Sequence, residues 1–167
     1  MRAERRLVNF AGFAVCAALI AYALYTQFHL GLEPCPLCIF QRIGVALMGL
    51  VFLVAALHNP RAPGRYVYAG ALAAASLATL AVAARHVYVQ SLPPGSLPSC
   101  GAPLASLVKF MPLWQVIRKV LTGSGECGEV NWRFLGLAMP AWVLISALIV
   151  GGVGVSANLR RGASAAR

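Results

Sequence analysis

The sequence predicts an all-α membrane protein: a four-helix up-and-down transmembrane bundle with a short amphipathic helix in its second outer loop. Of the 167 residues, 60% are hydrophobic and only 11% are charged, far below the quarter that is usual in a soluble domain. Four apolar stretches approach the ~20 residues with which a helix crosses a bilayer. They run about 7–28, 39–57, 66–84 and 135–157, and we expect residues 1–167 to form a single membrane domain.

The first stretch fits a transmembrane helix better than the core of a signal peptide. Arg2, Arg5 and Arg6 precede it, as basic residues precede a signal sequence. However, a signal-peptide core has about 7 to 15 apolar residues, and this run continues for more than twenty. Short connections then favour antiparallel neighbours among the four helices.

The basic residues indicate how the helices are oriented. Fourteen Lys and Arg against four acids give a net charge of +10, which is also typical of proteins that bind nucleic acid or anionic lipid. Most of the charge lies before the first helix, between the second and third, and after the fourth. By the positive-inside rule both termini face the cytoplasm, and the loops at about 29–38 and 85–134 face outward. We therefore expect a multi-pass protein of a bacterial inner membrane that contacts lipid and no nucleic acid.

The second outer loop contains a helical pattern. Apolar residues recur at spacings of three and four, with basic residues between them. The apolar positions are Leu104, Leu107, Val108, Met111, Trp114, Ile117, Val120 and Leu121. An amphipathic helix lying on the outer membrane surface has this pattern, and so does a helix that covers the end of the bundle. The sequence does not separate these two interpretations.

Cys35 and Cys38 form a Cys-x-x-Cys motif at the edge of the second apolar stretch. A disulfide across two residues gains little from loop closure, so this pair suits redox chemistry better than crosslinking. Cys38 opens the predicted helix, where the positive end of the helix dipole favours a thiolate. Arg42 follows one turn later on the same face, and an arginine within reach of hydrocarbon marks a functional site by default.

Cys100 and Cys127 form a second pair in the long outer loop. A disulfide between them would close a loop of about 28 residues and stabilise the fold by roughly 3 to 4 kcal/mol, so a structural staple is one interpretation. The glycines beside them favour a mobile pair instead. A mobile pair can exchange disulfides with Cys35 and Cys38.

A metal site is the main alternative, because four thiolates can bind zinc. The long separation of Cys100 and Cys127 does not fit the usual second zinc knuckle, and such a site leaves Arg42 unexplained. We therefore predict no metal, and keep a thiolate metal-binding membrane protein as the second hypothesis. Cys16, inside the first helix, is expected to be a small apolar filler.

The motif predicts a lipid-soluble acceptor for two electrons. The sequence contains no flavin or haem fingerprint, and a quinone dissolved in the membrane meets the requirement. Arg42 can donate to a quinone carbonyl and stabilise negative charge that develops on its oxygen. His86, at the outer end of the third helix, is a candidate second contact or proton donor.

These residues give the chain a resemblance to the DsbB family of bacterial inner-membrane, quinone-linked thiol oxidases. The resemblance covers nearly the whole chain and rests on residues 33–38 with Arg42, on Cys100 and Cys127, and on the segment 131–140. Gln41 departs from the family, in which some members carry an acid at that position.

The resemblance implies a protein-disulfide-forming oxidoreductase whose catalytic residues are Cys35, Cys38, Cys100 and Cys127. A DsbA-like periplasmic thioredoxin-fold protein would be the partner and would form a mixed disulfide with Cys100. Cys127 would exchange with Cys35, leaving Cys38 as the thiolate that contacts the quinone. Arg42 and His86 would complete the site for the cofactor, ubiquinone or menaquinone. A related interpretation uses the same cysteines and ligand site in reverse. In it, thiols reduce a quinone-like substrate for its own sake, as in vitamin K epoxide reductases.

Overall fold

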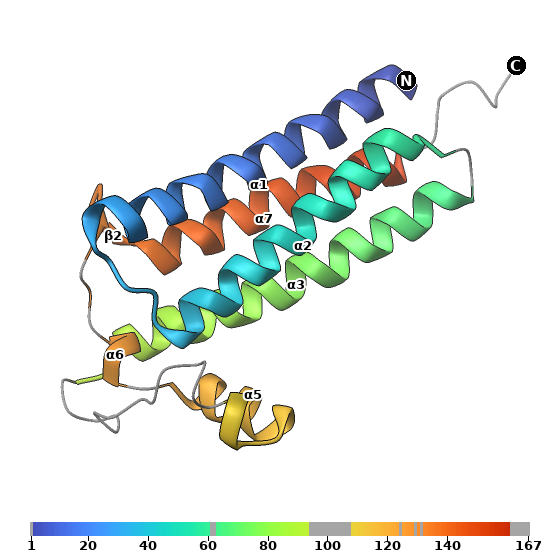
Figure 1. Cartoon of the computed structure of the whole chain (residues 1–167). Coiled ribbons are helices and arrows are strands. Elements are labelled where there is room, and N and C mark those ends of the chain that lie inside the picture. The colour runs from blue at the N-terminus through green and yellow to red at the C-terminus, as the bar shows by residue number, and fades with distance from the viewer. Residues whose placement is uncertain are drawn as a thin grey trace, which may run out of the picture.

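Four long helices make up most of the molecule. The computed structural model describes residues 2–60, 63–93, 108–123, 125–128, 130 and 132–160. The long helices are α1 (Arg2–Leu30), α2 (Pro36–His58), α3 (Gly64–Gln90) and α7 (Met139–Leu159). They lie side by side, and each is long and apolar enough to cross a membrane (Figure 1). The predicted all-α, four-span membrane bundle is therefore confirmed.

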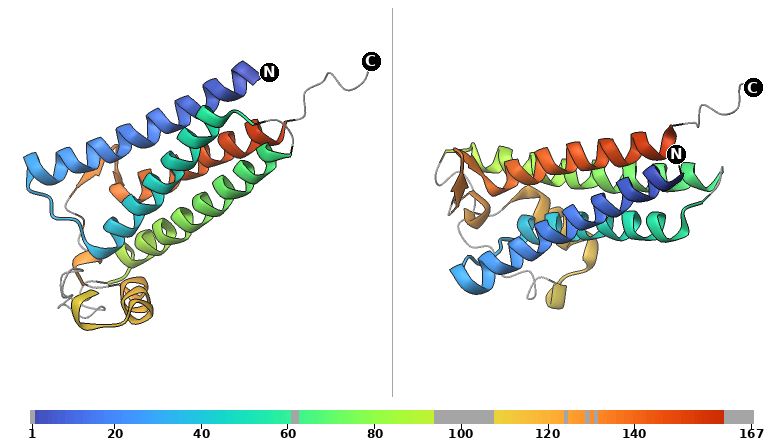
Figure 2. Two further views of the ribbon diagram at one scale, coloured as in Figure 1. Left: turned by 45° about the vertical axis from the view of Figure 1, so that its right-hand side comes forward. Right: turned by 90° about the horizontal axis from the view of Figure 1, so that it is seen from above.

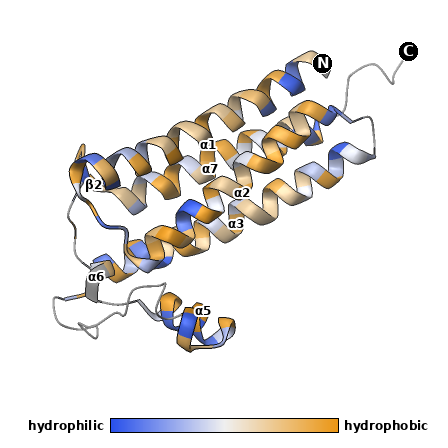
Figure 3. Ribbon diagram, in the orientation of Figure 1, coloured by the Kyte–Doolittle hydropathy of each residue, from blue (hydrophilic) through white to orange (hydrophobic). Residues whose placement is uncertain are grey.

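The bundle has two unlike ends. α1 begins and α7 ends at one of them, which we call the terminal end (Figure 1). The other, the loop end, carries the short helices α5 (Leu113–Thr122) and α6 (Gly125–Gly128) beside the ends of α2 and α3 (Figure 2). Apolar residues cover most of the length of the four helices, and polar ones gather toward the ends (Figure 3). This distribution matches a bundle whose middle lies in hydrocarbon.

Helix α2 starts and stops where its sequence dictates. Cys35 is the N-cap residue in an extended conformation, and Pro36 occupies the first turn, where its fixed φ and missing N–H are tolerated. At the other end Asn59 adopts a left-handed conformation with φ 39°. Pro60 follows and cannot continue the helix. The start of α2 therefore fixes the position of the Cys-x-x-Cys motif at the loop end.

Small residues allow the helices to approach closely around Phe52, which is fully buried in α2. A Cβ added to Gly12 of α1 would lie 2.7 Å from the Phe52 ring, and one added to Gly154 of α7 would also overlap it. Close approach through small residues is the usual way in which transmembrane helices gain packing energy. Phe52 thus joins α1, α2 and α7 in one core.

A pair of asparagines links α1 to α7 near the terminal end. The side-chain amide of Asn158 donates to Oδ1 of Asn9 at 2.9 Å and to the carbonyl of Gly154 at 2.8 Å. Asn9 donates back to Oδ1 of Asn158 at 3.4 Å, and both side chains are buried. Buried polar groups in an apolar bundle need such partners, so the pair ties the two helices together.

The predicted amphipathic helix corresponds to α5, which begins directly after Pro112. Val116 and Val120 on one face are buried against Leu37, Val89 and Cys127. The guanidinium of Arg85 also donates to the carbonyls of Leu121 and Thr122 at the end of α5. α5 therefore covers the loop end, as the second interpretation expected. Leu113, Trp114 and Ile117 of α5 are exposed, and the pattern residues Leu104 and Leu107 lie outside the described residues.

The last long helix begins four residues later than expected. A two-stranded hairpin, β1 (Arg133–Phe134) with β2 (Leu137–Ala138), occupies the predicted start. Its turn contains Leu135 at φ 50° and Gly136 at φ 81°, and two left-handed residues interrupt an α-helix. α7 then starts at Met139 with Pro140 in its first turn. α3 runs on to Gln90, six residues past the predicted 84, and α1 begins at Arg2, five residues before the predicted 7. The remaining helix boundaries differ from the predicted ones by one to three residues.

Candidate active site

Cys35 and Cys38 lie in the first turn of α2. The Sγ of Cys35 accepts a hydrogen bond from the backbone N–H of Cys38 at 3.4 Å. Both cysteines are half-buried free thiols, and their sulfurs are 3.1 Å apart. Because the N-cap conformation of Cys35 turns its side chain back over the helix start, the pair is arranged to open and close a disulfide with little movement of the backbone.

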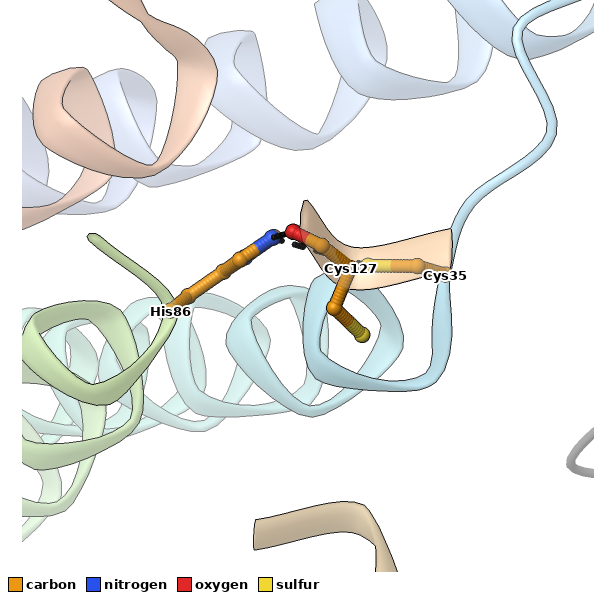
Figure 4. A group of neighbouring side chains, drawn as sticks. All are labelled: Cys35, His86 and Cys127. Atoms are coloured by element: carbon orange, nitrogen blue, oxygen red, sulfur yellow. Dashed lines mark hydrogen bonds between the residues drawn. The ribbon is translucent and has the colours of Figure 1, made fainter. Parts of the chain in front are cut away.

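Cys127 reaches Cys35 from the second loop. It belongs to the one-turn helix α6 and is only 1% exposed. Its Sγ, the Sγ of Cys35 and a ring nitrogen of His86 all lie within 4.8 Å of one another (Figure 4). The structure thus brings a sulfur of the loop next to a sulfur of the Cys-x-x-Cys motif, which is the geometry that thiol–disulfide exchange between two pairs requires.

His86 connects three elements at this place. Its Nε2 is 3.1 Å from the carbonyl oxygen of Cys127 and 3.7 Å from the Sγ of Cys35 (Figure 4). Its Nδ1 is 2.8 Å from the amide nitrogen of Gln41. Both His86 and Gln41 are buried. The ring of His86 therefore has a polar partner at each nitrogen and lies on the side of the motif that faces α6.

Arg42 points toward α1. One end of its guanidinium donates to the side-chain oxygen of Gln27, and the other donates to the carbonyl of Ala23 at 3.0 Å. Both partners are neutral oxygens, so they orient the guanidinium and leave its charge in place. A fixed positive charge thus lies one turn beyond Cys38.

A cavity of about 410 Å³ opens beside Cys38 and Arg42. Its volume is within the range of small-molecule sites, which are mostly apolar with a few polar groups. α1, α2, α7 and the hairpin segment all contribute to its wall. The lining residues are Leu19, Ile20, Tyr22, Ala23, Cys38, Gln41, Arg42, Val45, Trp132, Phe134, Met139, Pro140, Trp142, Val143 and Ser146. Cys38 is the cysteine of the motif that faces this space.

Aromatic rings form the wall of the cavity nearest the hairpin. Trp132 stacks on Phe134 with ring centres 6.1 Å apart and meets the edge of Tyr22. Trp142 of α7 packs against Phe134 and donates its indole N–H to the Phe134 carbonyl at 3.1 Å. Flat, rigid walls of this kind suit a flat ring as ligand.

Comparisons with known proteins agree with these features. Residues 5–157 match the family model described as Disulfide bond formation protein DsbB. The chain belongs to the DsbB family. Disulfide bond formation protein B of Xanthomonas euvesicatoria pv. vesicatoria is 53% identical over 135 residues, which are 80% of this chain and 78% of the relative. The protein of the same name from Chromobacterium violaceum is 48% identical over 143 residues, 83% of this chain and 86% of the relative. The resemblance to DsbB is confirmed, and the chain is a disulfide-forming membrane oxidoreductase.

The residues predicted to act in a DsbB-like site divide into two groups. Cys38 and Arg42 line the cavity, whereas Cys35, His86 and Cys127 meet beside it. Cys100 lies outside the described residues. Cys16 is buried in the bundle core beside Met48 and Phe52, as expected of an apolar filler.

No role was predicted for several residues that line or support the DsbB cavity. Gln27 is one of them, although a polar side chain inside an apolar helix is itself a signal of a buried partner. Trp132 and Phe134 were noted only within the motif that carries the resemblance, and Trp142 follows that motif by two residues. Their position beside Cys38 depends on the hairpin turn, which the helical pattern did not reveal.

Proposed function

We propose that this DsbB-family protein reoxidises a DsbA-like thioredoxin-fold protein of the periplasm and passes the two electrons to a membrane quinone, ubiquinone or menaquinone. The observation that supports this most is the division of the Cys-x-x-Cys pair. Cys38 lines an apolar cavity together with Arg42, whereas Cys35 lies against Cys127. One sulfur of the pair thus faces a ligand space and the other faces the loop.

The cavity fits a quinone ring. Its walls are almost entirely apolar and partly aromatic, its volume is about 410 Å³, and the cationic Arg42 is one of its lining residues. A quinone carries two carbonyl acceptors on a flat ring and, when bound, supplies the capacity to take up two electrons and two protons. Arg42 would donate to one carbonyl, and Cys38 would face the ring as the reacting sulfur.

The loop pair acts first in this scheme. A thiolate of the partner attacks Cys100 of the Cys100–Cys127 disulfide, which breaks that bond and forms a mixed disulfide. The second thiolate of the partner then displaces Cys100. The partner leaves with its own disulfide closed, and Cys100 and Cys127 hold the two electrons as thiols.

The motif pair then recovers these electrons. The Cys127 thiolate attacks Cys35, the Cys35–Cys38 bond breaks, and Cys38 leaves as a thiolate. Cys100 next attacks Cys127, which restores the loop disulfide and frees Cys35. Cys35 and Cys38 finally give up two electrons and two protons toward the cavity as their own disulfide closes.

The prediction that His86 contacts the quinone stays a prediction. Gln41 lines the cavity and His86 does not. In the described structure, Gln41 therefore connects a ligand in the cavity to the imidazole of His86.

We further propose that the terminal end faces the cytoplasm of a bacterial cell and the loop end faces the periplasm. Arg5, Arg6, Arg65 and Arg160 lie at the terminal end, as the positive-inside rule requires for a cytoplasmic face. The periplasm allows disulfides to persist, and the four proposed catalytic cysteines would be on that side. Reporter fusions after residues 60 and 93 test this, because an enzyme that is active only in the periplasm should work only in the second fusion.

The decisive experiment follows both ends of the electron path at once. Purified protein is mixed with reduced DsbA and ubiquinone, and quinone absorbance is recorded while the thiols are trapped and counted. We expect one quinone to be reduced for each DsbA disulfide formed. Cys38→Ser should abolish quinone reduction, and Cys16→Ser, which alters the buried filler, should not. Normal turnover of Cys38→Ser would refute the mechanism.

One observation favours the metal-binding alternative enough to test it beside the first. Cys35, His86 and Cys127 present three donor atoms within 4.8 Å, and sulfur and imidazole are zinc ligands. Elemental analysis of protein purified without chelator distinguishes the two functions. Stoichiometric zinc together with no reaction toward quinone would favour metal binding.

A further inference from the structure

The partners of His86 restrict which of its nitrogens carries hydrogen. The carbonyl oxygen of Cys127 only accepts, so Nε2, 3.1 Å away, must donate to it. In a neutral imidazole Nδ1 is then an acceptor, and the amide nitrogen of Gln41, 2.8 Å away, supplies the N–H. With this assignment both ring nitrogens of His86 have a complementary partner.

This chain of bonds links the loop to the bundle at the point where exchange takes place. His86 is 2% exposed and Gln41 is 3% exposed, so water does not compete for the bonds. α6 is a single turn, and so short a helix depends on contacts outside itself to keep its position. Its Cys127 is held at the backbone by His86, and the Cys127 Sγ is within 4.8 Å of the Cys35 Sγ (Figure 4).

We propose that His86, oriented by Gln41, is a latch for the second loop: its Nε2–H holds the backbone carbonyl of Cys127 so that the Cys127 sulfur lies against Cys35. The proposal rests on the proposed function, because it concerns the exchange between the loop pair and the motif pair. His86 and Gln41 are positioning residues in this scheme. Gln41 selects the tautomer, and His86 sets the place of the attacking sulfur.

The first test measures the position of Cys127 without any partner or quinone. In a Cys38→Ser, Cys100→Ser background only Cys35 and Cys127 remain at the site, and Cys16 stays buried in the core. The rate at which a mild thiol oxidant joins Cys35 to Cys127 is followed by trapping and non-reducing electrophoresis. His86→Leu should lower this rate about 10-fold, the scale expected when one buried hydrogen bond is lost.

Three further variants make the result specific. His86→Gln keeps an N–H donor at nearly the reach of Nε2 and should retain most of the rate. Gln41→Met keeps the length of the side chain but removes the N–H, and should lower the rate a few-fold. His58→Leu removes a histidine at the terminal end, which bonds Tyr68, and should change nothing. A His86→Leu rate equal to that of the parent protein, or a His86→Gln rate as low as that of His86→Leu, overturns the latch.

The second test compares two electron donors in the otherwise unmodified chain. Dithiothreitol is small enough to reduce the Cys35–Cys38 disulfide directly, whereas reduced DsbA must use the loop. His86→Leu should lower DsbA-driven quinone reduction about 10-fold and leave both the dithiothreitol-driven rate and the quinone KM unchanged. A higher quinone KM with both donors would show that His86 acts at the cavity, and would overturn the latch.

Failure of the latch can be distinguished from failure of the proposed function. If the unmodified protein reduces quinone with neither donor, the quinone function fails. The crosslinking rates still report whether His86 positions Cys127, because they require neither quinone nor DsbA.

Discussion

Trp142 donates its indole N–H to the carbonyl of Phe134, and this 3.1 Å bond fastens the hairpin to the first turns of α7. Both residues line the cavity beside Cys38. The bond therefore joins the hairpin wall of the candidate quinone site to α7. A wall held in this way keeps its shape when a ligand enters.

Trp142→Phe keeps a ring in the wall but removes the bond, so we expect the quinone KM to rise a few-fold. Trp142→Ala also removes the ring, and should raise the KM by about 10-fold or more. The measurement is quinone reduction at saturating reduced DsbA. Trp114→Phe is the matched control, because Trp114 is 61% exposed on α5. An equal effect of Trp142→Phe and Trp114→Phe would contradict the assigned role.

Arg42 and Gln27 should act on the same kinetic constant to different extents. Arg42→Ala removes the donor and the charge, and should raise the quinone KM about 10-fold or more. Gln27→Leu leaves the charge but removes a partner that orients it, and should raise the KM a few-fold. Arg65→Ala, at the terminal end, is the control. An unchanged KM in Arg42→Ala would remove Arg42 from the site.

The Asn9–Asn158 pair should contribute to stability and little to turnover. Each single change to Leu leaves the other amide without a partner on the facing helix, and the double change removes both groups. We expect a coupling free energy of about 0.6 to 1.7 kcal/mol, the range found for hydrogen bonds between membrane helices. A double-mutant cycle of unfolding in mixed micelles measures it. Additive effects would mean that the reciprocal bonds contribute nothing.

Two substitutions in α5 compare a buried position with an exposed one. Val120 is 3% exposed and packs in the cluster that contains Leu37 and Cys127, whereas Leu113 is 67% exposed. Val120→Asp buries a carboxylate, and should lower the melting temperature in detergent and slow DsbA-driven turnover. Leu113→Asp should leave the melting temperature in detergent unchanged. Equal destabilisation by both changes would show that α5 does not cover the bundle in this way.

The bundle was predictable because hydropathy and length decide where a chain crosses a bilayer. Cys35, Cys38 and Arg42 were recognisable for a related reason: each is unusual at the edge of an apolar segment. Their mutual arrangement also follows from local geometry, because Cys35 caps the helix that carries the other two.

The partners of these residues were not predictable in the same way. Gln27 meets Arg42 across two consecutive helices, and Cys127 meets His86 between a helix and a loop that are 41 residues apart. Periodicity reports which face of a helix is apolar, but it does not report which residue of a neighbouring helix lies opposite. The hairpin was missed because its apolar residues continue the hydropathy of the following helix. Only the backbone conformation of Leu135 and Gly136 separates the two.

The burial of Cys127 has a consequence for the order of events in turnover. Cys127 is 1% exposed and is enclosed by side chains of α2, α3 and α5. Its sulfur is therefore inaccessible to a folded protein in solution. In the proposed scheme Cys127 therefore receives electrons through Cys100 and not directly from the soluble partner. The proposed scheme predicts ping-pong kinetics, with parallel lines in double-reciprocal plots, because the oxidised partner departs before the electrons reach the quinone.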